Sequence, residues 1–221
     1  MKITAEIFEV GGANLTSPDD AAIYLIQFGN QAALVDSGCG HATRKLIDNI
    51  KRCGVEPARI KYLLLTHCHY DHTGGAAELK SRLGLEIVAH QLDAVYLEAG
   101  DNRVTAASWY GESLAPLQVD RKLTGPKEQL LLGGVTIEAV HVPGHSPGSV
   151  VYWTMSEGLR VLFAQDVHGP LDPSLLSNPA EYEKSLEVLL SIDADILCEG
   201  HYGVYRGKAE VADFISQFMK S

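Results

Sequence analysis

Three histidines and one aspartate fall within six residues of this chain, a density that is typical of metal ligands. They are His67, His69, Asp71 and His72. Imidazole and carboxylate groups are the ligands that zinc, iron and manganese prefer. A single histidine is more often an ordinary residue, but gathering four such groups for packing alone would cost desolvation energy without a structural return. The motif therefore predicts a metal site.

The elements on either side of this motif would set the directions of its side chains. The apolar run 62–65 before it is typical of a buried strand, and a glycine pair after it suits the start of a helix. Because alternate residues of an extended segment face one side, His67 and His69 can converge on one ion. Asp71 and His72 fall where the chain turns into the helix, and can point at a second ion.

Three further polar residues each lie just beyond a predicted strand: His145, Asp166 and His201. His145 stands among glycines and prolines, which form tight loops that hold a side chain in place. Each residue alone is explained as a turn residue, but with the motif they complete a set of seven ligands for two ions. In this set His67, His69 and His145 bind the first ion, Asp71, His72 and His201 bind the second, and Asp166 bridges the two with a water or hydroxide.

Other polar residues have ordinary interpretations, with two exceptions. Asp36 follows the predicted strand 31–35 and could begin a turn, but we expect it to orient the metal loop as a hydrogen-bond acceptor. His168 lies close to Asp166 in the sequence and could touch the pocket. The remaining histidines are expected to be exposed or satisfied by the fold; they are His41, His90 and His141.

Strand and helix patterns alternate along the chain, which favours a sheet protein with helices outside two stacked sheets. Its 221 residues are 46% hydrophobic, enough for the core of a single domain over 1–221. Helices are expected over 41–53, 76–83, 180–191 and 209–218, and strands over 3–10, 21–28, 31–35, 62–65, 85–89, 130–132, 135–142, 150–155, 160–164 and 196–198.

The segment 91–120 is the least patterned part of the chain. Short helices are expected around 95–97 and 106–110. Trp109 and Tyr110 are most simply core aromatics, although they could line the pocket, because insertions between core elements commonly carry specificity.

Composition excludes several classes of protein. A net charge of -10 without basic runs argues against nucleic-acid binding. No apolar run approaches the roughly 18 residues of a membrane span, and the N-terminus lacks the pattern of a signal peptide. Four scattered cysteines suggest reduced thiols and a cytoplasmic location. One of them, Cys68, lies between His67 and His69. In an extended segment its side chain points away from theirs, so we interpret it as a packing residue.

Taken together, these residues resemble the pattern of the metallo-β-lactamase superfamily, whose signature is H-x-H-x-D-H. The motif 67–72 reproduces it, and 36–38, 144–148, Asp166 and 200–201 follow in the family's order. The resemblance implies an α+β fold, a four-layer αβ/βα sandwich in which two mixed sheets pack face to face with helices on the outer faces. It also implies metals at the edge between the sheets and mostly hydrolytic chemistry.

Departures from individual branches narrow the choice. The exported β-lactamases are disfavoured by the missing export signal, and the flavodiiron relatives carry Glu where His69 stands. Nuclease branches add a large domain or an RNA-binding arm, and the glyoxalase II branch adds a C-terminal helical portion that is not evident after His201. The chain is most similar to a generic hydrolase of the glyoxalase II and lactonase kind.

We therefore predict hydrolysis of a small ester, thioester or lactone by a hydroxide that bridges two divalent ions, most simply zinc, with iron or manganese as alternatives. Asp71 or Asp166 would relay the proton. Tyr202 could donate a hydrogen bond to the oxyanion or leaving group; a partly buried aromatic beside the loop is an equal interpretation. The segments 91–120 and 167–178 would select the small-molecule substrate.

Three alternatives remain. A persulfide dioxygenase of the same fold would use one iron held by His67, His145 and Asp166, a two-histidine, one-carboxylate set suited to oxygen chemistry. The intact second set of ligands makes this the second choice. A phosphodiesterase, or a metal-binding protein without catalysis, is less favoured.

Overall fold

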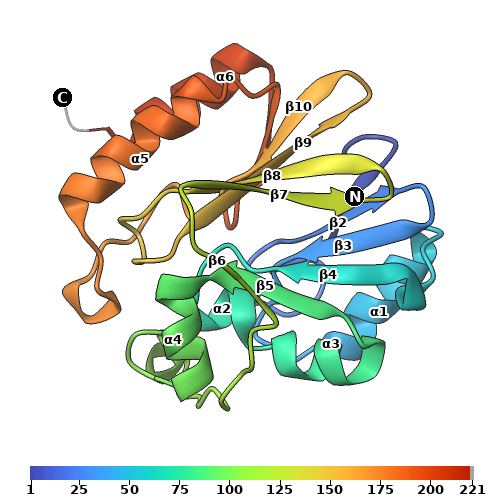
Figure 1. Cartoon of the computed structure of the whole chain (residues 1–221), viewed down its shortest axis with the longest axis horizontal. Coiled ribbons are helices and arrows are strands. Elements are labelled where there is room, and N and C mark those ends of the chain that lie inside the picture. Colours follow the sequence, from blue (N-terminus) through green and yellow to red (C-terminus); the bar gives the residue numbers. More distant parts are fainter. Residues whose placement is uncertain (220–221) are drawn as a thin grey trace.

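Two six-stranded mixed sheets form the centre of the computed structural model, which describes residues 1–219 (Figure 1). The first sheet runs in the order β1 (Ile7–Gly11), β2 (Ile23–Phe28), β3 (Gln31–Val35), β4 (Ile60–Leu64), β5 (Glu86–His90) and β6 (Arg121–Leu123). The second runs in the order β12 (Val204–Arg206), β11 (Ile196–Cys198), β10 (Leu159–Phe163), β9 (Val150–Ser156), β8 (Val135–His141) and β7 (Lys127–Leu132).

Each sheet contains both kinds of strand pairing, and the connections explain why. β2 and β3 are antiparallel because the two-residue turn Gly29-Asn30 joins them. β3, β4, β5 and β6 are parallel neighbours, and so are β10 and β11, since longer crossovers connect them. The carboxyl ends of parallel neighbours meet at one edge of a sheet, where open sheets usually gather ligands.

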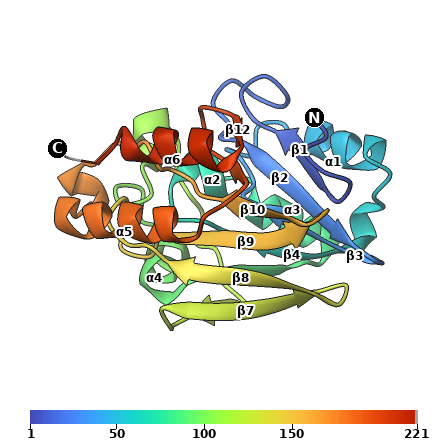
Figure 2. The ribbon, with the colours of Figure 1, turned by 90° about the horizontal axis from the view of Figure 1, so that it is seen from above.

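Within residues 1–219, helices cover the outer faces of both sheets, which Figures 1 and 2 show from two directions. The longest begins where Asn178 accepts hydrogen bonds from the N–H groups of Ala180 and Glu181, and Pro179 occupies its first position. Two others end at glycines in the left-handed conformation, Gly84 and Gly100. The helices are α1 (Thr43–Arg52), α2 (Tyr70–Thr73), α3 (Ala76–Leu83), α4 (Gln91–Ala99), α5 (Pro179–Ser191) and α6 (Lys208–Ser216), with 3₁₀ turns η1 (Pro57–Arg59), η2 (Ala107–Tyr110) and η3 (Pro173–Leu175).

Three clusters of buried apolar side chains hold these layers together. One lies between the sheets and includes Tyr24, Tyr152 and Phe163. A second packs helices such as α1, through Leu46, onto the first sheet, and a third packs α5 and α6, with residues such as Leu186, onto the second sheet. Burial of apolar surface on both faces of each sheet stabilises the four layers.

The predicted four-layer α+β sandwich is therefore confirmed, with differences in detail. The first strand begins at Ile7 rather than Ile3, and the helix expected around 106–110 is only the turn η2. β6 and β12 were not predicted, because three residues at a sheet edge carry almost no periodic signal. Within 1–219, no helix is both long and apolar enough to cross a membrane.

Candidate metal centre

Four loops bring the seven predicted ligands to one place, at the carboxyl ends of the central strands. The motif 67–72 follows β4 and forms the short helix α2. His145 lies between β8 and β9, Asp166 follows β10, and His201 follows β11. All seven residues therefore meet although almost 130 positions separate the motif from the last of them.

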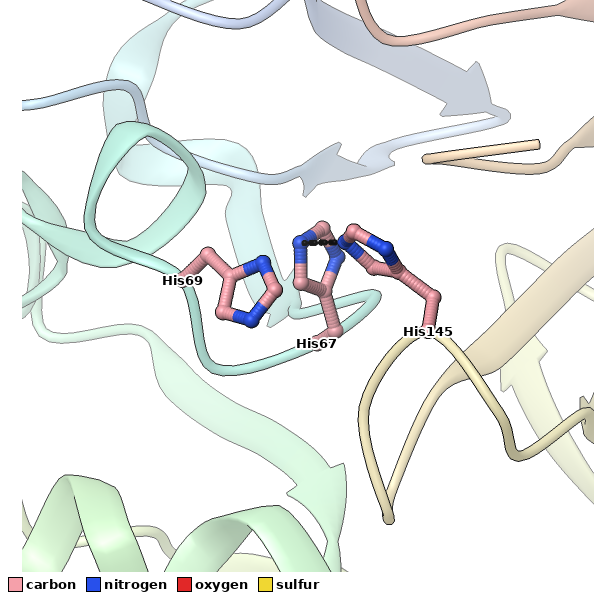
Figure 3. A group of neighbouring side chains, drawn as sticks. All are labelled: His67, His69 and His145. Atoms are coloured by element: carbon pink, nitrogen blue, oxygen red, sulfur yellow. Dashed lines mark hydrogen bonds between the residues drawn. The ribbon is translucent and has the colours of Figure 1, made fainter. Parts of the chain in front are cut away.

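Three of them, His67, His69 and His145, form one group, and Figure 3 shows their imidazole rings converging. Each residue is at most 4% exposed. The ring centroid of His67 lies 4.4 Å from that of His69 and 4.7 Å from that of His145. The Nε2 atoms of His67 and His145 are 3.3 Å apart. His67 and His69 come from one extended stretch, as the alternation of side chains predicts.

The second group contains Asp71, His72, Asp166 and His201. His201 Nε2 lies 3.2 Å from Asp71 Oδ2, and His72 Nε2 lies 3.4 Å from the same oxygen. Three of the four residues are buried, whereas the His201 side chain is 34% exposed. The group therefore opens to solvent on the His201 side.

Asp166 stands between the two groups. Its Oδ2 lies 3.4 Å from Nε2 of both His72 and His201 in the second group, and 3.7 Å from Nε2 of His145 in the first. A carboxylate that reaches both groups is the arrangement expected of a residue that bridges two ions.

The charges of these residues suit metal ligands. Burial, followed by the neighbouring imidazoles, lowers the pKa of His67 well below its usual value and that of His69 to about 3. Burial also lowers the pKa of His145. These three rings are consequently neutral at pH 7, which is the form of histidine that binds metal.

In the second group, by contrast, the aspartates and histidines favour their charged forms. Burial by itself would raise the pKa of Asp71 and Asp166, but His72 and His201 keep both below the usual value. Burial likewise would lower the pKa of His201, but its bonds to Asp166 and Asp71 raise it to about 10. Protons on the two histidines thus supply positive charge among the carboxylates, in the place that a divalent ion would take.

Two buried atoms give a direct test of whether these residues fit a metal. Nε2 of His69 and Oδ1 of Asp166 are buried and have no hydrogen-bond partner among the described residues. Orphaned polar atoms are costly inside a protein. Within each group, one donor atom from every member lies within 4.8 Å of all the others. The residues therefore fit one ion in each group.

Asp36 supports the motif as the sequence predicts. It is fully buried at the end of β3, and its Oδ2 accepts hydrogen bonds from His72 Nδ1 at 2.7 Å and Thr66 Oγ1 at 2.7 Å. Its Oδ1 accepts the Thr66 N–H at 2.8 Å. These bonds leave His72 Nε2 facing the second group.

Other predicted residues are also placed. Cys68 is buried in the core as expected. His41 is 39% exposed at its side chain. His90 stacks on His141 with ring centroids 3.8 Å apart, and each has a backbone partner: His90 Nδ1 accepts the N–H of Leu92 at 3.4 Å and His141 Nε2 donates to the Pro147 carbonyl at 2.9 Å. The ring centroid of His168 lies 5.1 Å from that of His201, a member of the second group.

Three aromatic residues differ from the simplest expectations. Trp109 and Tyr110 are not core aromatics, since they are 53% and 37% exposed. Burial and the charge of Asp71 raise the pKa of Tyr110, and a hydrogen bond to Asp71 contributes. Tyr202 is 61% exposed rather than partly buried, with its ring 4.9 Å from that of His168.

A polar cavity of about 270 Å³ lies beside His201 and Tyr202. Residues 12–14 and Asp20 also line this cavity. A small molecule could therefore reach the exposed side of the second group.

Two buried carboxylates beside the site were missed by the sequence reasoning. Asp93 on α4 is 1% exposed and Glu199 after β11 is fully buried. An aspartate in the first turn of a helix is an ordinary feature, so Asp93 gave no signal. Glu199 could have been noticed, because it precedes the Gly-His pair that carries His201.

Comparison with known proteins agrees with the fold. The family model described as the metallo-beta-lactamase superfamily matches residues 16–201, and the chain belongs to this superfamily. A metallo-β-lactamase from Cronobacter sakazakii, solved as a motif mutant, has the same fold, with a TM-score of 0.81 at 22% identity over 99% of this chain and 92% of that one.

Two relatives are named as hydrolases. The hydroxyacylglutathione hydrolase GloC of Haemophilus influenzae is 34% identical over 138 residues, which cover 62% of this chain and 60% of that protein. The acyl-coenzyme A thioesterase MBLAC2 of Gallus gallus is 26% identical over 220 residues, which cover 86% of this chain and 75% of that protein. The chain thus matches less than two thirds of the Haemophilus protein's length.

Proposed function

We propose that this chain is a metal-dependent hydrolase that holds two divalent ions, most simply zinc, and cleaves a small ester, thioester or lactone. His67, His69 and His145 would hold one ion and Asp71, His72 and His201 the other. The observation that carries this proposal is the position of Asp166, whose Oδ2 lies within 3.4–3.7 Å of histidines from both groups.

The metal would supply the reactive water and polarise the carbonyl, since bound divalent ions lower the pKa of water to about 7. The protein's own residues would do the rest. Asp71 and Asp166 remain ionised and can take up a proton released at the site. Tyr202, exposed beside the cavity, could donate a hydrogen bond to the carbonyl oxygen or leaving group.

The relatives support the choice of acyl substrates. One is named as a hydroxyacylglutathione hydrolase and another as an acyl-coenzyme A thioesterase. Because loops decide specificity on a shared fold, the particular acyl compound is left to experiment. The exposed aromatics of the segment 91–120, Trp109 and Tyr110, are candidates for selecting it.

A mononuclear persulfide dioxygenase is the alternative. It would need only His67, His145 and Asp166 around one iron. The second group is complete and partly open to solvent, which supports the hydrolase instead.

A substrate panel on protein of measured metal content tests the proposal. Thioesters, lactones, esters and phosphodiesters are assayed for hydrolysis, and glutathione persulfide for oxygen consumption. We expect hydrolysis of an acyl substrate that His69→Ala or Asp71→Ala abolishes. One iron per chain with oxygen consumption, and no acyl hydrolysis, would refute the hydrolase.

A further inference from the structure

Two buried carboxylates outside the ligand set each join a pair of the loops that carry ligands. We infer that Asp93 and Glu199 are positioning residues, and that each supports one ion: Asp93 the His67, His69 and His145 site, and Glu199 the site that includes His201. This inference rests on the proposed two-ion centre.

Asp93 connects the motif to the loop that carries His145. Its Oδ2 accepts hydrogen bonds from the N–H of Cys68 at 2.8 Å and from Ser146 Oγ at 2.7 Å. Its Oδ1 accepts the N–H of Gly148 at 2.6 Å. Cys68 lies between the two motif histidines of the first site, and Ser146 follows its third histidine.

The fit around Asp93 is close. A Cβ on Gly148 would stand 2.6 Å from the Asp93 nitrogen and 2.7 Å from its Cγ, so only glycine lets the loop reach this carboxylate. None of the three hydrogen bonds described for Asp93 runs to the ring of a candidate ligand. Its three bonds run to the loops on either side of the first site instead.

Glu199 makes the same kind of connection at the second site. Its Oε2 accepts hydrogen bonds from the N–H groups of His201 at 2.6 Å and Tyr202 at 2.9 Å. Its Oε1 accepts a bond from Nδ1 of His168 at 2.8 Å. His168 lies two residues beyond Asp166, so one carboxylate ties the Asp166 loop to the His201 loop.

His201 has particular need of such support. Its side chain is 34% exposed, whereas the other candidate ligands are buried. It also lies on a short turn with glycines on both sides, at positions 200 and 203. Without Glu199, the two N–H groups that hold this turn would lose their acceptor.

Outer hydrogen bonds of this kind are worth about 10–100-fold in metal affinity. If the two carboxylates position ligands, each should affect the binding of a different ion. That difference distinguishes the positioning of ligands from a general stabilisation of the fold. A merely structural role would weaken both sites together.

The test measures zinc affinity at each site by competition with a chelator, starting from metal-free full-length protein. His69→Ala and His201→Ala define the loss of the first and second site. We expect Glu199→Ala to weaken zinc binding at one site about 10–100-fold. Combined with His201→Ala, which removes that same site, it should cause no further loss of affinity. Combined with His69→Ala, the two losses of affinity should add. Asp93→Ala should give the reverse pattern.

Conservative variants keep the test valid if an alanine variant fails to fold. Glu199→Gln retains an acceptor for both N–H groups and should restore most of the affinity, and Asp93→Asn should weaken only the first site. The exposed Glu210→Ala serves as the control and should change neither. Equal weakening of both sites, or none, in Asp93 and Glu199 variants would overturn the inference. A wild-type chain that binds no zinc, iron or manganese would refute the proposed function itself.

Discussion

Replacing Gly200 by alanine should disable the metal centre through a single methyl group. A Cβ at this position would stand 2.3 Å from Asp166 Oδ1, 3.0 Å from Gln165 Oε1 and 3.3 Å from His72 Cε1. Since Cβ contacts below 3.0 Å are essentially never found, the Asp166 carboxylate would have to move by roughly 1 Å. Gly200 is not in the left-handed region, so the backbone itself accepts alanine.

A displacement of roughly 1 Å at a reacting centre can cost about 100-fold in rate, which corresponds to about 2.7 kcal/mol. We therefore expect Gly200→Ala to lower kcat about 100-fold on the best substrate of the panel and to reduce the zinc bound per chain. Both are measured on the same preparation, by steady-state kinetics and elemental analysis.

Gly125→Ala is the matched control, because the nearest atom to its added Cβ would be 3.6 Å away and its backbone is also outside the left-handed region. This variant should match the wild type in zinc content and kcat. Wild-type zinc content and turnover in Gly200→Ala would refute the reasoning, since Asp166 would then not need its observed position.

Three further predictions concern His90, Tyr202 and Tyr110. Burial, followed by the neighbouring His141, lowers the pKa of His90 in the folded chain to about 4. Below pH 6.5 the unfolded chain therefore binds a proton at this histidine that the folded chain does not, and the stability of the fold falls as the pH drops. Between pH 7 and pH 5, the free energy of unfolding of the metal-free wild type, measured in urea, should fall by about 1–2 kcal/mol more than that of His90→Gln. Equal decreases in the two proteins would contradict this. Tyr202→Phe should lower kcat about 100-fold, and unchanged kcat would leave Tyr202 as an aromatic neighbour of His168. Tyr110→Phe removes the hydroxyl beside Asp71 and should weaken zinc binding about tenfold in the chelator competition; wild-type affinity would exclude a supporting role.

The clustering of the candidate ligands could be predicted from the sequence, because the motif and each of the three later residues follow a predicted strand. His145, Asp166 and His201 are separated widely along the chain, yet strands that enter one sheet in parallel end at one edge. Asp36 followed from the same reasoning. The meeting of these residues at one edge could therefore be predicted from the order of strands in the sequence.

The supporting residues could not be read in this way. Asp93 acts across two loops, and nothing in α4 distinguishes it from an ordinary acidic residue in a first helical turn. Tyr110 is brought near Asp71 by the turn η2, which has left-handed residues at both ends, Ala106 and Gly111. Loops of this kind have no periodic pattern, so their contacts appear only in the folded chain.

The most direct test of the two-ion centre is a zinc titration of the metal-free chain with measured stoichiometry. We expect two ions per wild-type chain and one per chain in His201→Ala, because that variant leaves the three-histidine group intact. One ion in the wild type, unchanged by His201→Ala, would contradict a centre in which Asp166 joins two metal sites.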